Sequence, residues 1–248
     1  MSEEQPQEAV ILVGGRGSRL RSVVDDRPKP MAPVLGKPFL EWLILYLKSQ
    51  GMARIVLATG YRGEMVHEYF GDGDPWDIEI SYSQENEPLG TGGALRLALE
   101  KTTTEQVIVL NGDSFCSFDL QKLSHVFMVN HADAVMLLVE MNDCDRFGSV
   151  EIDEDGRIMG FCEKSTRTGR GLINAGIYLL SRSCVESLPK GKYLSLEQNV
   201  FPDLVHKRFY SLTEGGPFID IGTPESYAMA AEFLDLLALP KSIGGMNV

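Results

Sequence analysis

The chain has 248 residues, of which 44% are hydrophobic, so it can bury a sizeable core within one large domain. Its formal net charge of −12 argues against binding to nucleic acid or to an anionic membrane, since either needs a broadly positive surface. No apolar run approaches the roughly 18 residues of a membrane span, and the acidic N-terminus is unlike a secretory signal. The 4 cysteines are scattered without a C-x-x-C pair, which suits buried thiols in a reducing compartment, so we expect a cytoplasmic protein.

The first half of the sequence alternates short apolar runs with amphipathic stretches. Strands are expected at 8–13, 54–59, 78–83 and 106–113. Helices are expected at 38–50, 63–70 and 91–101, the last with Thr91 as its cap, and a further helix around 120–127. This βαβαβαβ order predicts a parallel sheet that helices cover on both faces.

The pattern changes after about residue 134. Strand-like segments are expected at 133–141, 147–153, 157–164 and 173–181, with the hairpin signal Asp155-Gly156 between two of them. Two helices follow, one near 195–206 with a capping box of Ser195 and Gln198, and one at 224–239 with Thr223 as cap. We therefore predict a single α/β domain, 1–248, with a Rossmann-like, mixed but mostly parallel sheet. Its halves are about 8–133 and 134–239, and its loose tails are 1–7 and 240–248.

Glycines and positive charges gather directly after the first expected strand. Gly14, Gly15 and Gly17 let the backbone turn tightly and bring N–H groups against an anion, while Ser18 adds a hydroxyl and Arg19 a charge. Ligands of open α/β sheets bind at this carboxyl edge, so phosphate is the expected guest. The spacing is neither G-x-G-x-x-G nor G-x-x-x-x-G-K-[ST], so neither of those functions follows. A tight turn that binds nothing is the structural alternative.

Lys29 stands between two prolines shortly after these glycines. Pro28 and Pro30 stiffen the segment, which fixes where the ammonium points and reduces the entropy that it loses on gripping a phosphate. The alternative is a solvated lysine in a proline-rich loop.

Six segments, in order along residues 9–224, resemble the sugar-1-phosphate nucleotidyltransferases. They are GGRGSRL with RPKPMAPVLGKP, EPLGTGGA, NGD, EK, NAGIY and IDIGTP. The resemblance implies the nucleotide-diphospho-sugar transferase fold, with a nucleotide-binding first half and a sugar-binding second half. It also implies that a sugar 1-phosphate oxygen attacks the α-phosphorus of a nucleoside triphosphate and expels pyrophosphate, so that positioning and cationic stabilisation supply most of the catalysis.

The same resemblance selects the site residues one by one. The catalytic residues that it implies are Arg19, Lys29, Asp113, Lys164 and Asp220. Arg19 and Lys29 would hold the triphosphate, and Lys164 would hold the phosphate of the sugar. Asp113 and Asp220 would bind Mg²⁺, which takes hard oxygen ligands. A turn aspartate, a residue preceding a helix and a surface Glu-Lys pair are the structural alternatives for Asp113, Asp220 and 163–164.

Substrate contacts complete this set. The nucleotide contacts implied are Val13, Gly14, Gly15, Gly17, Ser18, Arg19, Gln84, Glu85, Pro88, Gly90, Thr91, Asn111 and Gly112. The sugar contacts implied are Gly148, Glu163, Lys164 and Asn174.

Base recognition falls to residues 83–93. A carboxylate or carbonyl that faces the N1–H and N2–H donors of guanine would select that base, and Gln84, Glu85, Glu87 and the Gly90 backbone are the candidates. A glutamine amide with backbone groups satisfies uracil or thymine equally well, so the residues alone leave the base open.

Within the family, residues 19–42 look most like the D-glycero-D-manno-heptose 1-phosphate guanylyltransferases, which make GDP-heptose for bacterial surface polysaccharides. The substrates would then be GTP and a sugar 1-phosphate, the cofactor Mg²⁺, and the products a GDP-sugar and pyrophosphate. A homodimer is a fair expectation from the family. The alternatives are a mannose 1-phosphate guanylyltransferase, a glucose 1-phosphate thymidylyl- or cytidylyltransferase and, from another class, a non-catalytic nucleotide-sensing subunit.

Overall fold

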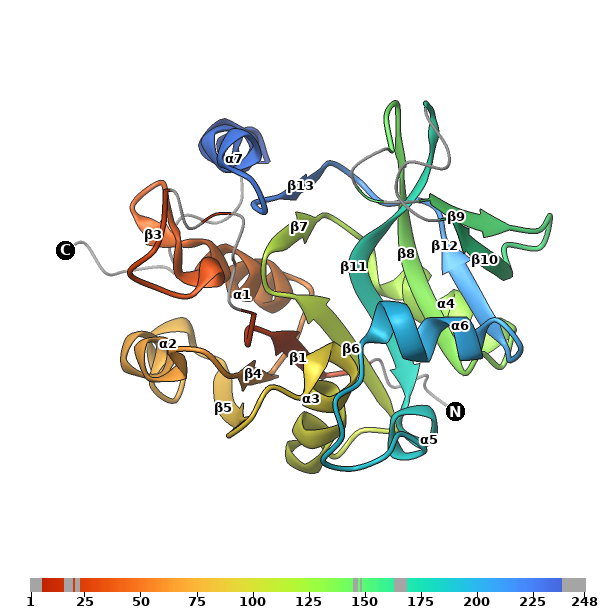
Figure 1. The fold of residues 1–248 in the computed structure, drawn as a ribbon, viewed down its shortest axis with the longest axis horizontal. Helices are drawn as coiled ribbons and strands as arrows, with labels where there is room; N and C mark the ends of the chain where they lie inside the picture. The colour runs from red at the N-terminus through yellow and green to blue at the C-terminus, as the bar shows by residue number, and fades with distance from the viewer. Residues whose placement is uncertain are drawn as a thin grey trace.

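The computed structural model describes residues 6–15, 20, 23–144, 147, 149–162 and 169–237 (Figure 1). A seven-stranded sheet lies at its centre, in the order β12-β8-β11-β6-β1-β4-β5. The strands are β1 (Glu8–Leu12), β4 (Arg54–Thr59), β5 (Glu79–Gln84), β6 (Gln106–Asn111), β8 (Ala134–Met141), β11 (Gly171–Ser181) and β12 (Phe209–Leu212). Of these seven, β11 runs antiparallel to both of its neighbours, and the other pairs are parallel. The predicted mixed, mostly parallel sheet is confirmed, and it contains strands from both predicted halves of the chain.

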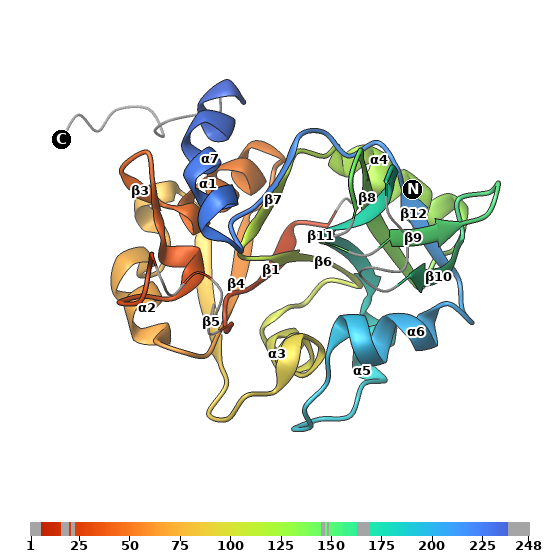
Figure 2. The same ribbon diagram turned by 45° about the horizontal axis from the view of Figure 1, so that its top comes forward.

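Helices cover both faces of this sheet (Figure 2). One face carries α1 (Phe39–Ser49), α2 (Gly63–Phe70), α4 (Leu120–Val129) and α7 (Pro224–Leu236), and the other carries α3 (Gly90–Ala98), α5 (Arg182–Glu186) and α6 (Phe201–Leu204). Alternate residues of a strand point to opposite faces. Ala9 and Ile11 of β1 therefore belong to one hydrophobic cluster and Val10 to the other. The parallel strands are buried on both faces, which explains their continuous apolar runs.

Shorter elements extend beyond the main sheet. The hairpin of β9 (Ser149–Ile152) and β10 (Ile158–Cys162) confirms the Asp155-Gly156 signal, and Gly156 has the positive φ of +78° that favours glycine. The sequence prediction had no counterpart for several elements. These are β2 (Pro33–Val34), β3 (Lys37–Pro38), β7 (Ser114–Cys116), β13 (Phe218–Asp220), β12 and α5.

The expected role of Thr91 as a helix cap is wrong. The helix α3 begins at Gly90. Two N–H groups of its first turn, those of Gly92 and Gly93, donate to the Leu194 carbonyl at 2.8 and 3.3 Å. Thr91 Oγ1 instead accepts a hydrogen bond of 2.8 Å from the Leu196 N–H. A segment about a hundred residues further along the chain therefore caps α3, and local sequence cannot indicate such a cap.

The expected helix at 195–206 is also corrected. It is a five-residue π-helix, Leu196–Val200, followed by the short α6. The Ser195 hydroxyl accepts from the Gln198 N–H as predicted, but the reciprocal acceptor for the Ser195 N–H is Asn199 Oδ1, at 2.8 Å. The capping box of Thr223 at the start of α7 is present, with Ser226 as its partner.

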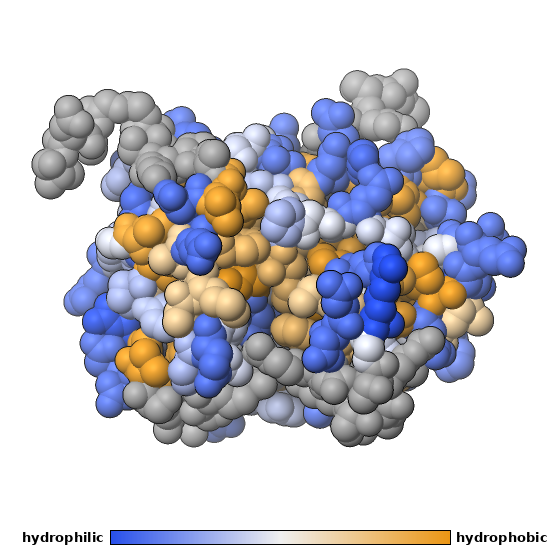
Figure 3. Space-filling view, turned by 90° about the horizontal axis from the view of Figure 1, so that it is seen from above, coloured by the Kyte–Doolittle hydropathy of each residue, from blue (hydrophilic) through white to orange (hydrophobic). Residues whose placement is uncertain are grey.

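The surface and the cysteines agree with the composition. Hydrophobic and hydrophilic side chains are interspersed on the face seen from above (Figure 3). No helix within the described ranges has the length and apolarity needed to cross a membrane. Cys116, Cys144 and Cys184 are buried, and burial raises the pKa of the Cys116 thiol to about 12.

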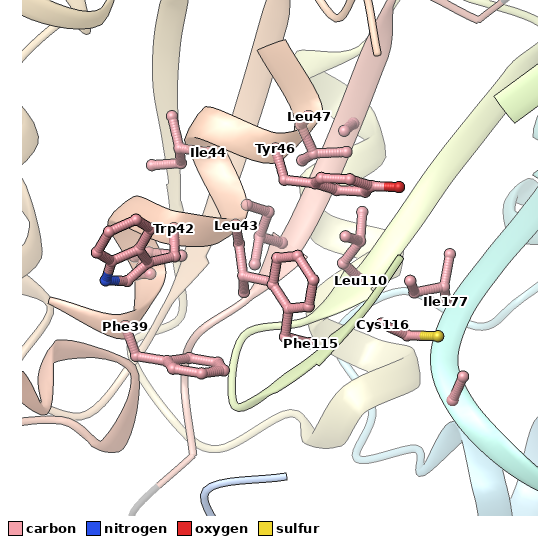
Figure 4. Packing of buried hydrophobic residues seen from close by; sticks show 14 of the residues in the cluster. Phe39, Trp42, Leu43, Ile44, Tyr46, Leu47, Leu110, Phe115, Cys116 and Ile177 are labelled. Carbon is pink, nitrogen blue, oxygen red and sulfur yellow. The ribbon is translucent and has the colours of Figure 1, made fainter. Parts of the chain in front are cut away.

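The packing around α1 fixes the turn that carries Asp113. Tyr46 points from α1 towards β6 and β7, and its ring contacts Phe115 edge-on, with 5.1 Å between ring centroids (Figure 4). Its hydroxyl donates to the Phe118 carbonyl and accepts from the Phe118 N–H, both at 2.6 Å. One buried hydroxyl thus satisfies two backbone groups just after β7.

The substitution Tyr46→Phe leaves both backbone groups of Phe118 without this partner. We expect the free energy of unfolding to fall by about 1–3 kcal/mol, the usual cost of an unsatisfied buried polar group. Urea unfolding of the two proteins measures the change. An unchanged free energy of unfolding would mean that Phe118 finds other partners.

Candidate functional site

The carboxyl ends of β1, β4, β5 and β6 open onto a cavity of about 790 Å³. The predicted site residues that line it are Gly14, Gly15, Lys29, Gln84, Glu85, Pro88, Gly90, Thr91, Asn111 and Asp113. A Cβ built at Gly15 meets no atom of the described residues within 4 Å. The structure thus brings the glycine-rich turn, the 84–91 segment and the Asn-Gly-Asp turn to one cavity.

Other predicted residues lie away from the lining or outside the described residues. Val13 and Gly112 are buried behind the wall, and a Cβ at Gly112 would lie 2.7 Å from the Leu12 carbonyl oxygen. Gly112 therefore permits the close packing of β1 against the turn after β6. Gly17, Ser18, Arg19, Gly148, Glu163 and Lys164 fall outside the described residues.

A lysine and two carboxylates meet near one end of the cavity, where Lys29 and Asp113 belong to the lining and Asp220 does not. Lys29 Nζ donates to Asp113 Oδ2 at 2.7 Å and lies 3.8 Å from Asp220 Oδ2. The Lys29 side chain is only 8% exposed, and a buried ammonium needs charged partners. The sequence predicted all three residues for the site, although it did not predict that they contact one another.

Pairing of two short strands brings the carboxylates together. Ser114 of β7 lies opposite Asp220 of β13, and the Ile221 N–H donates to the Asp113 carbonyl at 3.0 Å. Lys29 comes from a third part of the chain, the 3₁₀ turn Lys29–Met31. Residues about 190 positions apart therefore share one cluster.

Gly222 is a site residue that sequence reasoning missed. Its N–H donates to Asp220 Oδ1 at 2.8 Å and so orients that carboxylate. A Cβ at this position would lie 2.6 Å from Asp220 Oδ1 and 3.1 Å from Lys29 Nζ. The signal was present in the Gly-Thr-Pro sequence after Asp220.

The two carboxylates suit a hard divalent cation. Magnesium commonly takes one or two carboxylates and completes its shell with water and phosphate oxygens. Within the described residues, no group of three or more His, Cys, Asp or Glu side chains forms a complete protein cage. The donor set of Asp113 and Asp220 therefore fits a cation that is shared with a phosphate ligand.

Glu85 occupies the junction of three loops at the other end of the cavity. Its Oε2 accepts the Leu89 N–H at 2.9 Å, and its own N–H donates to the Thr59 carbonyl. A Cβ on Gly60 would lie 2.5 Å from Glu85 Oε1, and one on Gly14 would lie 3.1 Å away. Burial raises the pKa of this carboxyl, and the bond from Leu89 opposes the rise. Gly60 was missed because its reason is this non-local approach.

Asn174 and Asn111 meet around Tyr178, beside the lysine cluster. Asn174 Nδ2 donates to the Tyr178 hydroxyl at 2.9 Å, and Asn174 Oδ1 accepts the Gly176 N–H at 2.8 Å. The Asn111 side chain lies near this hydroxyl and tends to lower its pKa, and Asn111 Oδ1 has no hydrogen-bond partner among the described residues. Burial of Tyr178 raises the pKa of its hydroxyl. Asn174 is therefore held by the fold beside Asn111 but does not line the cavity.

Two further lining residues were not predicted. Glu197 accepts hydrogen bonds from the hydroxyls of Thr91 at 3.2 Å and Ser195 at 2.9 Å. Tyr193 stands at the rim with 67% of its surface exposed. Both belong to the segment that caps α3, so their approach depends on a tertiary contact.

These features together define a class of protein. A glycine-lined cavity at the carboxyl edge of an α/β sheet, with a lysine and two carboxylates clustered near one end, is typical of an enzyme that acts on nucleotide phosphates.

Comparisons with known proteins agree with this class. The model of the Nucleotidyl transferase family matches residues 8–235. The chain is 42% identical to the D-glycero-alpha-D-manno-heptose 1-phosphate guanylyltransferase of Aneurinibacillus thermoaerophilus, over 92% of this chain and 98% of that protein. It is 42% identical to the enzyme of the same name from Campylobacter jejuni, over 89% and 96%. The crystal structure of HddC from Yersinia pseudotuberculosis complexed with GMP-PN has a TM-score of 0.82 and 38% identity, covering 92% of this chain and 99% of that one.

The chain belongs to the nucleotidyl transferase family, and it is a nucleotidyltransferase enzyme. The predicted family and fold class are confirmed.

The substitution Gly222→Ala tests the packing of the lysine–carboxylate cluster. The added Cβ forces Asp220 or Lys29 to move, so we expect nucleotidyl transfer to fall at least tenfold, by about 1.4 kcal/mol or more in activation free energy. Gly160→Ala in β10 is the matched control, because the nearest atom of the described residues, Glu151 Oε2, would lie 4.0 Å from its Cβ. Equal activity of the two variants would remove the role assigned to Gly222.

Proposed function

We propose that the protein transfers GMP from GTP to a sugar 1-phosphate with Mg²⁺ as cofactor, giving a GDP-sugar and pyrophosphate. The preferred sugar is D-glycero-alpha-D-manno-heptose 1-phosphate, so the product is GDP-heptose for surface polysaccharide synthesis. One observation carries the reaction: Lys29 and Asp113 line the same cavity as the glycine turn, and Asp220 Oδ2 lies 3.8 Å from Lys29 Nζ. The guanine base and the heptose are supported by the names of two relatives that match nearly the whole chain.

Each part of the chain has a task in this proposal. Lys29, with Arg19, holds the triphosphate and stabilises the leaving pyrophosphate, while the N–H groups of Gly14 and Gly15 approach the phosphates. Asp113 and Asp220 hold the cation, which when bound neutralises charge on the phosphate oxygens. No protein nucleophile is needed, since the sugar phosphate oxygen attacks directly.

The second substrate is assigned to the other half of the site. Lys164 binds the phosphate of the incoming sugar, and Glu163 accepts hydrogen bonds from sugar hydroxyls. Asn174 contributes through its contact with the Asn111 and Tyr178 cluster, and Gly148 lets the sugar ring approach the backbone.

Guanine is the base that the cavity suits best. Glu85 and Glu87 place carboxylates along the segment that the base would reach, and Gln84 lies beside them. A carboxylate accepts from both N1–H and N2–H of guanine, whereas uracil and thymine offer a single donor.

A substrate panel tests the proposal directly. Pyrophosphate release is measured with Mg²⁺, each of GTP, ATP, CTP, UTP and dTTP, and the 1-phosphates of heptose, mannose and glucose. We expect GTP with heptose 1-phosphate to give the highest kcat/KM. Turnover of glucose 1-phosphate with dTTP, and none of heptose 1-phosphate with GTP, would overturn the proposed substrates. A higher kcat/KM with mannose 1-phosphate would overturn the heptose alone.

The substitution Asp113→Asn tests the cation-binding role. The amide keeps the size and an acceptor for Lys29 but loses the charge that a divalent cation needs, so Mg²⁺-dependent turnover should fall about a hundredfold or more. The thermal unfolding midpoint checks that the fold persists. Retained turnover would mean that another carboxylate holds the cation.

A further inference from the structure

The two carboxylates that the proposed function assigns to the divalent cation already contact a positive charge of the protein itself, the Lys29 ammonium. We propose that Lys29 is a positioning residue whose ammonium competes with the divalent cation for Asp113 and Asp220, holding both carboxylates in place until the cation and the triphosphate arrive. This inference rests on the proposed function in one respect, the assignment of these aspartates as cation ligands.

The contacts of the ammonium support competition. Lys29 Nζ lies 2.7 Å from Asp113 Oδ2 and 3.8 Å from Asp220 Oδ2, so it bridges the two carboxylates. The backbone of Gly222 closes one side, since a Cβ built there would lie 3.1 Å from Nζ. A divalent cation that binds both carboxylates must weaken or replace these contacts, because two cations cannot share them without repulsion.

The burial of the three side chains shows why the pairing matters. The Lys29 side chain is 8% exposed, Asp113 is 39% exposed and Asp220 is 22% exposed. The lysine has therefore lost nearly all of its water and depends on the carboxylates for compensation. A lysine whose only role was to await a phosphate would be better solvated in the free protein.

Hydrogen bonds hold the backbone around Lys29 in place, while the Lys29 residue borders the cavity. The Met31 N–H donates to the Pro28 carbonyl at 2.8 Å, and the Ala32 N–H donates to the Lys29 carbonyl at 3.0 Å. Lys29 also lines the cavity beside Asp113 and Gly15. A rotation of its side chain thus exchanges carboxylates for a phosphate without any movement of the main chain.

The exchange couples the two ligands of the site. The divalent cation binds more tightly when the ammonium leaves the carboxylates, and the triphosphate binds more tightly when the ammonium becomes free to contact it. Each ligand therefore raises the affinity for the other, as linkage requires. The protein without nucleotide should accordingly bind a divalent cation weakly.

Mn²⁺ binding to the nucleotide-free protein tests this competition, with free Mn²⁺ measured by electron paramagnetic resonance. Lys29→Met removes the ammonium and should tighten Mn²⁺ binding at least tenfold. Lys37→Met is the matched control, because Lys37 also pairs with a buried carboxylate, Glu41, at 2.6 Å, outside the cavity. It should leave the Mn²⁺ affinity at the wild-type value. Wild-type or weaker Mn²⁺ affinity in Lys29→Met, or equal tightening in both variants, would overturn the proposal.

Thermal unfolding gives a second measurement, which compares each protein in a chelator with the same protein in Mn²⁺. Lys29→Met and Lys29→Gln should unfold at a lower temperature than wild type in a chelator and regain stability as Mn²⁺ is added, whereas the wild type should respond little. Equal responses of the variants and the wild type would contradict the competition.

These outcomes are distinct from failure of the proposed function. If no substrate pair turns over but Lys29→Met tightens Mn²⁺ binding, the competition stands and the proposed reaction is wrong. If the double variant Lys29→Met/Asp113→Asn binds Mn²⁺ as tightly as Lys29→Met alone, Asp113 does not hold the cation. The competition is then overturned, whichever substrates turn over.

Discussion

The buried contact of Lys29 with Asp113 and Asp220 is the constraint on which the rest of the site depends. An ammonium that is 8% exposed is tolerated only where opposite charge reaches it, so three distant segments must converge accurately. The fold supplies this convergence in separate ways. Tyr46 fixes the backbone after β7, the pairing of β7 with β13 sets the distance between the carboxylates, and the prolines around Lys29 fix its main chain.

The sequence predicted six of the seven strands of the main sheet because these are determined locally, and it missed the four-residue edge strand β12. The parallel strands are buried on both faces and therefore read as apolar runs; Asp113 was predicted as the last residue of the fourth strand, whereas β6 ends two residues earlier, at Asn111. The strands β7 and β13 escaped prediction because each has only three residues and is stabilised by pairing with the other. The expected cap at Thr91 failed for the same reason, since the group that caps α3 is the Leu194 carbonyl. Motif order indicated which residues belong to the site, but only tertiary pairing determines which of them touch.

Close packing gives several glycines near the cavity a reason that the motifs did not supply. Gly60 and Gly14 make room for the Glu85 carboxylate, while Gly222 makes room for the lysine cluster. Gly176, with φ at +76°, lets the backbone pass within contact distance of Asn111. The cavity is thus shaped less by large side chains than by positions where any side chain would collide with a polar group. At such glycine positions a ligand can approach the backbone closely, and the surrounding polar groups are held in place.

The charge of the whole chain gives the lysine–carboxylate pairing a further consequence. With a net charge of −12, the protein repels free anions at long range, and the carboxylates of Asp113 and Asp220 would repel a triphosphate at short range as well. Lys29 offsets part of this repulsion before any ligand arrives, and it does so without leaving a mobile charge on the surface. A nucleotide that carries its own divalent cation then meets a cavity whose negative charge is already balanced in part. In the proposed exchange, the Lys29 ammonium turns from the carboxylates to the phosphates, so the acidic character of the chain and the basic character of its glycine-rich segment would serve one site.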